Sequence, residues 1–101
     1  MKVLLGTRDL VFRSKLGAVV RESGGGELVR DGEASDLVVL DVEAPGAIER
    51  IRALVGQGVA VLAFGPHVRA ELLREAREAG ATAVPNSQVE DQLRRCIFPE
   101  P

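Results

Sequence analysis

The sequence contains neither tryptophan nor tyrosine, and only three of its 101 residues are phenylalanine. A protein that stacks nucleic-acid bases needs more aromatic side chains than this. The charge balance points the same way, because 13 Lys and Arg against 15 Asp and Glu give a formal net charge of −2. A surface of that charge does not attract the phosphate backbone by bulk electrostatics. We therefore expect no nucleic-acid partner.

Cysteine and histidine each occur once, as Cys96 and His67. A single cysteine excludes an intramolecular disulfide and a zinc site built from cysteines. A single histidine excludes a metal site built from several imidazoles. We expect neither a metal ion nor a cofactor. Cys96 is predicted to belong to the core, and His67 to lie on the surface or cap a helix.

Long hydrophobic runs are also missing. No apolar run approaches the 18 residues that a membrane-spanning helix needs, and residues 1–5 are too short for the apolar part of a signal peptide. We therefore expect a cytoplasmic protein with no membrane partner. Hydrophobic residues still make up 46% of the chain, enough for one domain spanning residues 1–101 to bury a core.

Short apolar runs alternate with longer stretches of helical periodicity. The predicted strands are residues 3–5, 27–30, 37–40, 59–64 and 81–84. One face of a helix carries Phe12, Leu16, Val19 and Val20. Asp9 is a candidate N-cap of this helix, which ends at the glycines 24–26. Because that glycine run follows a helix, it is predicted to end the helix and not to cradle a phosphate.

Three further helices are predicted in the second half of the chain. One follows Pro45, and the next begins at Gly65-Pro66 with Val68 on its apolar side. The last begins at Ser87, which with Glu90 has the spacing of a capping box, in which each side chain bonds the other residue's backbone N–H.

Continuous Val and Leu runs separated by helices predict a parallel sheet covered on both faces. The connection between the second and third strands is an exception. It consists of residues 31–36, whereas a helical crossover needs roughly 10–12 residues. Six extended residues reach roughly 20 Å, enough to return along a short strand without a helix. The helix between strands 2 and 3 is therefore predicted to be missing.

The segment 36–46, DLVVLDVEAPG, resembles the third-strand region of two-component response-regulator receiver domains, where an aspartate ends the strand and Pro-Gly follows. The segment 80–84, GATAV, resembles the start of the receiver fifth strand. The resemblance implies a three-layer, flavodoxin-like α/β fold with strand order 2-1-3-4-5. It also makes Asp41 the phosphoacceptor-like residue.

The same resemblance implies supporting groups that this sequence lacks. Receivers carry an acidic pair after the first strand, a hydroxyl residue after the fourth and a lysine after the fifth. The matching residues here are Thr7 and Arg8 or Gly6 and Thr7, then Gly65, then Asn86 or Ser87. The nearest acid to the first strand is Asp9, two residues late. Since aspartyl phosphorylation needs a held cation and groups that stabilise the phosphoryl oxygens, Asp41 is predicted to be a poor phosphoacceptor.

Ligands of open α/β sheets bind at the carboxyl ends of the strands, which gives a candidate pocket. Its predicted members, besides Asp41, are Thr7, Arg8, Asp9, Gly65, His67 and Ser87. Arg8 is predicted to pair with Asp41. The alternative role for Asp41 is that of a solvated or salt-bridged loop carboxylate.

Function remains open among three hypotheses. The first is a non-catalytic pseudo-receiver, not an enzyme, that signals through a protein partner or a homodimer. The alternatives are a small-ligand or nucleotide-binding domain and a true phosphoacceptor receiver using Asp41. Self-association is expected because the missing helix would leave an underprotected apolar strip. The residues of that strip are Leu28, Val29, Val38 and Leu40.

Overall fold

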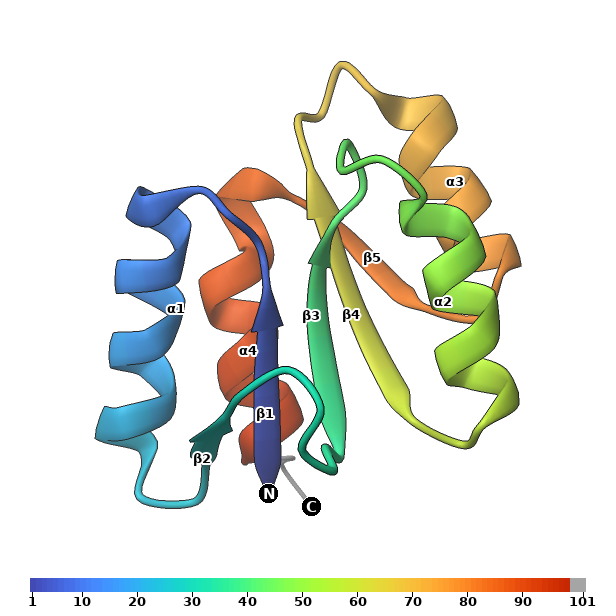
Figure 1. Cartoon of the computed structure of the whole chain (residues 1–101). Helices are drawn as coiled ribbons and strands as arrows, with labels where there is room; N and C mark the ends of the chain where they lie inside the picture. Colours follow the sequence, from blue (N-terminus) through green and yellow to red (C-terminus); the bar gives the residue numbers. More distant parts are fainter. Residues whose placement is uncertain (99–101) are drawn as a thin grey trace.

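The computed structural model describes residues 1–98, which form one sheet and its covering helices (Figure 1). The strands are β1 (Lys2–Gly6), β2 (Glu27–Val29), β3 (Leu37–Asp41), β4 (Ala60–Gly65) and β5 (Thr82–Pro85). The helices are α1 (Leu10–Ser23), α2 (Ala47–Gly56), α3 (Ala70–Glu78) and α4 (Val89–Ile97), with a 3-10 turn, Asn86–Gln88, before α4.

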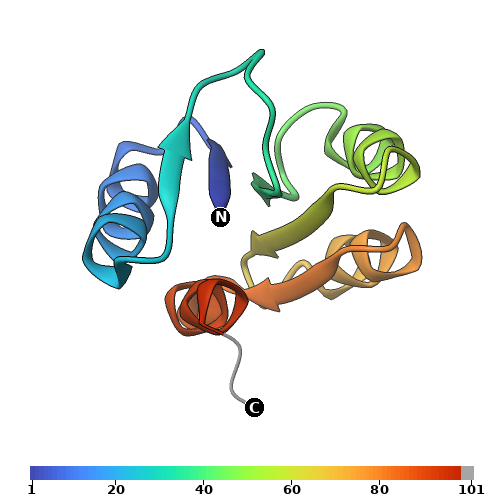
Figure 2. The same cartoon turned by 90° about the horizontal axis from the view of Figure 1, so that it is seen from below.

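All neighbouring strands run parallel, in the order β2-β1-β3-β4-β5. The predicted fold class and strand order are therefore confirmed. Helices α1 and α4 cover one face of the sheet, and α2 and α3 cover the other (Figure 2). Every strand consequently ends at the same edge, which Figure 1 places at the top.

Two apolar cores lie on the two faces of the sheet. The first packs Leu16 and Val20 of α1 and Leu93 of α4 against the strands, and the rings of Phe12 and Phe64 lie 4.9 Å apart. The second packs Ile51 of α2 and other α2 and α3 side chains against the opposite face. The alternation of strand side chains between the two cores is the pattern expected of a sheet buried on both sides.

The connection between β2 and β3 contains no helix, as predicted. It forms a tight turn in which the Arg30 N–H donates to the Glu33 carboxylate at 2.9 Å and the Glu33 N–H donates to the Arg30 carbonyl at 3.0 Å. At its far end Asp36 is bonded to Lys2 through both its backbone N–H and its carboxylate. We call residues 31–36 the crossing loop.

The strip expected to be underprotected is smaller than predicted. Val38 and Leu40 are buried, because β3 is a central strand whose side chains pack under Ile51 of α2. Leu28 on the edge strand is 36% exposed, and Val29 is half-buried. The crossing loop and the end of α2 enclose a groove of about 380 Å³ over β1 and β3. The prediction for Val38 and Leu40 was therefore wrong.

The start of α3 also differs from the prediction. Gly65 is the last residue of β4, and residues 66–69 form a turn closed by the Arg69 N–H donating to the Pro66 carbonyl at 2.9 Å. The guanidinium of Arg69 bonds Glu71, which lowers the pKa of that carboxyl below its ordinary value. The helix therefore begins at Ala70, and Val68, expected on the apolar face, is 71% exposed.

The capping box expected at Ser87 is not formed. Ser87 lies inside the 3-10 turn, and α4 begins two residues later without a side-chain cap. Cys96 is half-buried against the first core, and this burial raises the pKa of its thiol. None of the helices within residues 1–98 has both the length and the apolar character needed to cross a membrane.

Candidate functional site

The carboxyl ends of β1 and β3 border a cavity of about 440 Å³. We call it the edge cavity. Its lining residues are Gly6, Thr7, Arg8, Asp9, Asp41, Glu43, Ala44, Pro45 and Arg50. The adjacent central strands of a parallel α/β sheet place their following loops side by side here, which is where such folds bind ligands.

The loop after β1 is tightly held. Thr7 is buried, and its Oγ1 accepts from the Asp9 N–H at 3.2 Å. Asp9 caps α1, because its carboxylate accepts from the Val11 and Phe12 N–H groups at 2.9 and 3.2 Å. Arg13 donates to the carbonyl oxygens of Leu5 and Thr7 from the first turn of α1. The Asp9 carboxylate is therefore committed to the helix end.

The carboxylates of the loop after β3 also have partners within the protein. The Asp41 carboxylate accepts from the Glu43 N–H at 2.9 Å, and the Asp41 carbonyl accepts from the Ala44 N–H at 3.2 Å. The Glu43 carboxylate lies 3.2 Å from the guanidinium of Arg69. Asp41 is half-buried at the strand end and faces the backbone of its own loop.

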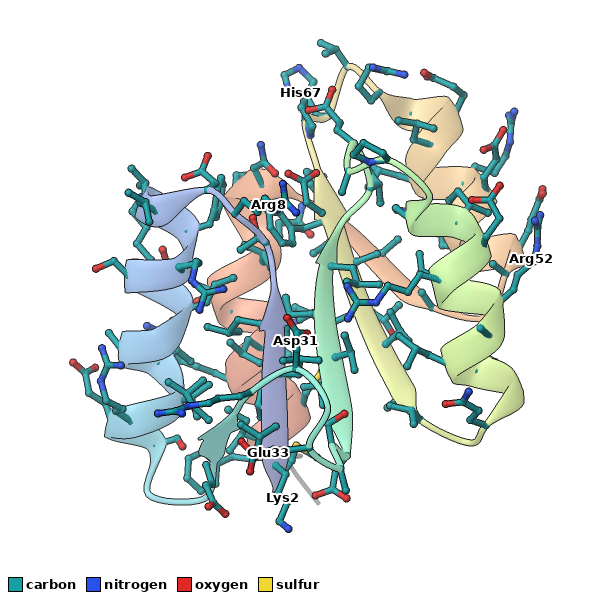
Figure 3. All side chains as sticks on the ribbon, viewed as in Figure 1. Lys2, Arg8, Asp31, Glu33, Arg52 and His67 are labelled. Atoms are coloured by element: carbon teal, nitrogen blue, oxygen red, sulfur yellow. The ribbon has the colours of Figure 1, made fainter. Side chains whose placement is uncertain are left out.

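The predicted pairing of Arg8 with Asp41 is not present. Both residues line the edge cavity, but the ion pairs found within residues 1–98 do not include one between them. The reason is local, because the Asp41 carboxylate turns to the Glu43 N–H and thereby closes an Asx-type turn. Arg8 is left exposed at the rim of the cavity (Figure 3).

Arg50 is one of the lining residues that the sequence analysis missed, together with residues 43–45. It lies in the first turn of α2, lines the edge cavity and approaches Asp31 of the crossing loop at 3.7 Å. One signal for it was present, since a positive charge near a helix N-terminus is unfavourable without a nearby anion. Arg50 also borders the groove under the crossing loop, so its side chain separates the two cavities.

Two glycines at strand ends are closed off by packed side chains. A Cβ on Gly6 would overlap Cδ2 of Leu40 and lie 3.1 Å from the Val39 carbonyl. A Cβ on Gly65 would lie 2.5 Å from Cγ2 of Val42. Leu40 and Val42 are both buried, so neither can move aside without repacking.

The other predicted pocket residues are not brought into the edge cavity. Thr7, Arg8, Asp9 and Asp41 line it together, whereas Gly65, His67 and Ser87 do not. His67 is exposed in the turn before α3 (Figure 3), and Ser87 is exposed before α4. The neighbouring Asn86 has a buried Oδ1 with no hydrogen-bond partner in the described part of the chain.

The receiver resemblance implies a divalent cation beside Asp41, and the residues here do not fit one. Mg²⁺ binds carboxylate oxygens, yet β1 ends at Gly6 and is followed by Thr7 and Arg8. The Asp9 carboxylate is already bonded to backbone N–H groups at the N-terminus of α1. Among residues 1–98, no three or more His, Cys, Asp or Glu side chains gather where they could hold a metal ion.

No protein-family model matches the chain, and no curated protein matches it by sequence. Solved structures do match. The BeF3-activated DrrB receiver domain is 21% identical with a TM-score of 0.78, covering 95% of this chain and 92% of its own. A response regulator receiver protein from Burkholderia phymatum is 24% identical with a TM-score of 0.73, covering 95% and 90%.

The signal receiver domain of the response regulator NarL from Mycobacterium tuberculosis matches over 98% of this chain and 97% of its own, with 17% identity and a TM-score of 0.74. These neighbours share an architecture with this chain at low sequence identity. The chain therefore has the receiver fold, which is flavodoxin-like.

Proposed function

We propose that this chain is a pseudo-receiver: a cytoplasmic signalling domain spanning residues 1–101 that carries out no chemistry of its own and acts by binding another protein. The observation that carries the proposal is the packing at the sheet edge. Leu40 occupies the space beside Gly6, and Val42 occupies the space beside Gly65. Where Gly6 and Gly65 stand for the acidic and hydroxyl residues that the receiver resemblance implies, the packed neighbours leave no room for such side chains.

The remaining polar groups support the same conclusion. Transfer of a phosphoryl group to an aspartate needs a free carboxylate and positive groups fixed around the phosphoryl oxygens. Asp41 is tied to the Glu43 N–H, and no acidic partner from β1 stands beside it. A carboxylate in this setting is better suited to shaping the β3–α2 loop than to accepting a phosphoryl group.

The protein is expected to remain unmodified when incubated with Mg²⁺ and acetyl phosphate. Intact-mass spectrometry measures the result, with a catalytically active receiver domain as the positive control. A stoichiometric gain of one phosphoryl group that Asp41→Asn abolishes would overturn the proposal. In that case the third hypothesis, a true phosphoacceptor, would be correct.

The surface proposed for partner binding is the β2 edge beside the crossing loop. Leu28 is 36% exposed there. β2 is the edge strand of the sheet, and the connection from β2 to β3 contains no helix that could cover it. Edge strands present unpaired backbone groups that favour association. A second copy of the chain is the partner proposed for this edge.

A further inference from the structure

The charges around the edge cavity fall into two groups. The carboxylates all have partners: Asp9 caps α1, Asp41 accepts from the Glu43 N–H, and Glu43 is paired with Arg69. Each of these interactions compensates a negative charge within the protein. The carboxylates are therefore poor partners for anything that enters the cavity.

The two guanidinium groups that line the cavity are much less engaged. Within residues 1–98, Arg8 has neither a hydrogen bond to another side chain or carbonyl nor an ion pair. Arg50 has one ion pair, at 3.7 Å with Asp31, whose side chain is 87% exposed. An ion pair this exposed and this long adds little stability.

We propose that the edge cavity binds a small anion carrying a phosphate group, held between Arg8 and Arg50. This inference rests on the proposed function, since a site that performs no phosphotransfer is free to bind phosphate reversibly. A guanidinium presents paired N–H donors that match two oxygens of a phosphate. A cavity of about 440 Å³ accommodates a phosphate together with a small organic group.

The position of Arg50 gives the site a further property. Its Nη1 would lie 3.5 Å from a Cβ on Gly6, so the guanidinium reaches the end of β1. Its Nη2 simultaneously faces Asp31 of the crossing loop. An anion in the edge cavity therefore competes with Asp31 for the positive charge of the same guanidinium.

The test measures the affinity of the full chain for inorganic phosphate by isothermal titration calorimetry, with AMP as a second probe for a phosphate monoester. Arg8→Gln and Arg50→Gln should each weaken phosphate binding about tenfold or more, as expected for losing a charge-assisted hydrogen bond. Arg52→Gln is the matched control, because Arg52 lies on the same helix but lines the groove between α2 and α3 (Figure 3).

A fourth variant tests the competition in the opposite direction. Asp31→Asn should strengthen phosphate binding by up to about fivefold, because it removes the carboxylate that competes for Arg50. This gain is not produced by a variant that merely misfolds. Binding of inorganic phosphate alone indicates a site for the free ion, and tighter binding of AMP indicates a site for a phosphate monoester.

The inference is overturned if phosphate shows no saturable binding, or if Arg52→Gln weakens binding as much as Arg50→Gln does. Failure of the proposed function gives a different result. It is seen as covalent phosphorylation of Asp41 by acetyl phosphate, which persists after dialysis. Reversible phosphate binding that dialysis removes, without a change in mass, supports both proposals.

Discussion

The space around Gly6 and Gly65 determines which chemistry this sheet edge offers. Buried side chains from β3 and from the residue after it, Leu40 and Val42, fill the space that a side chain at either glycine would need. Neither glycine therefore has room for an acidic or hydroxyl side chain unless these neighbours repack. Because interiors are close-packed, placing a larger side chain at either glycine would require its buried neighbour to move.

Gly65→Ala should lower the free energy of unfolding by about 1–3 kcal/mol, because the added Cβ would press on Val42. Urea denaturation followed by circular dichroism measures the change. Gly56→Ala is the matched control: Gly56 ends α2 with nothing within 4 Å of an added Cβ. Alanine should be neutral or stabilising there, by up to about 1 kcal/mol. Equal effects at the two glycines would contradict the account of the packing.

At the scale of single elements, the ends of the helices carry most of the differences between expectation and structure. The α1 N-terminus has the cap that the sequence predicts, with Asp9 accepting two backbone N–H groups. The α3 and α4 N-termini have no side-chain cap. A turn at residues 66–69 and a 3-10 turn at 86–88 precede them instead. The helix ends at the site are therefore shaped by loops as much as by caps.

Alanine substitutions at Asp9 and Ser87 distinguish a helix N-terminus that has a side-chain cap from one that has none. Asp9→Ala should destabilise the protein by about 0.5–2 kcal/mol, since two backbone N–H groups of α1 lose their acceptor. Ser87→Ala should change stability by less than about 0.5 kcal/mol, because Ser87 is exposed and is not the cap of α4. Thermal denaturation of both variants measures the difference. A loss at Ser87 as large as that at Asp9 would show that the capping box does form.

The molecule as a whole has one complete face and one incomplete face. Helices α1 and α4 cover the first face, whereas α2 and α3 leave the β2 side of the second face to the crossing loop (Figure 2). Only Leu28 among the four residues expected in that strip is substantially exposed, because Val38 and Leu40 lie in a central strand packed under α2. The surface available for association is therefore an edge and not a broad patch, which favours a modest affinity.

Sedimentation velocity at micromolar concentration should detect a dimer that Leu28→Asp dissociates. The added carboxylate would be buried without a partner at the proposed interface. Leu10→Asp is the control, because Leu10 is 79% exposed at the start of α1, away from β2. A chain that is monomeric at every concentration, or a dimer that Leu28→Asp leaves intact, would contradict this interface.

The sequence by itself determined the architecture. Apolar runs that alternate with helical patterns specify a parallel sheet covered on both faces, with right-handed crossovers. The length of the crossing loop excluded a helix between β2 and β3, because residues 31–36 are too few to form one and return. Asp9 could be identified as a helix cap because it directly precedes a segment whose apolar residues recur with helical spacing.

Only the tertiary structure decided the details of the edge cavity. Asp41 had two available partners, Arg8 across the strands and a backbone N–H in its own loop, and the local turn prevailed. Arg50 reaches the cavity from α2, a contact that depends on how the helix packs on the sheet. The same packing places Leu40 and Val42 against Gly6 and Gly65. Contacts of this kind join residues distant in sequence, and their geometry exists only once both cores have formed.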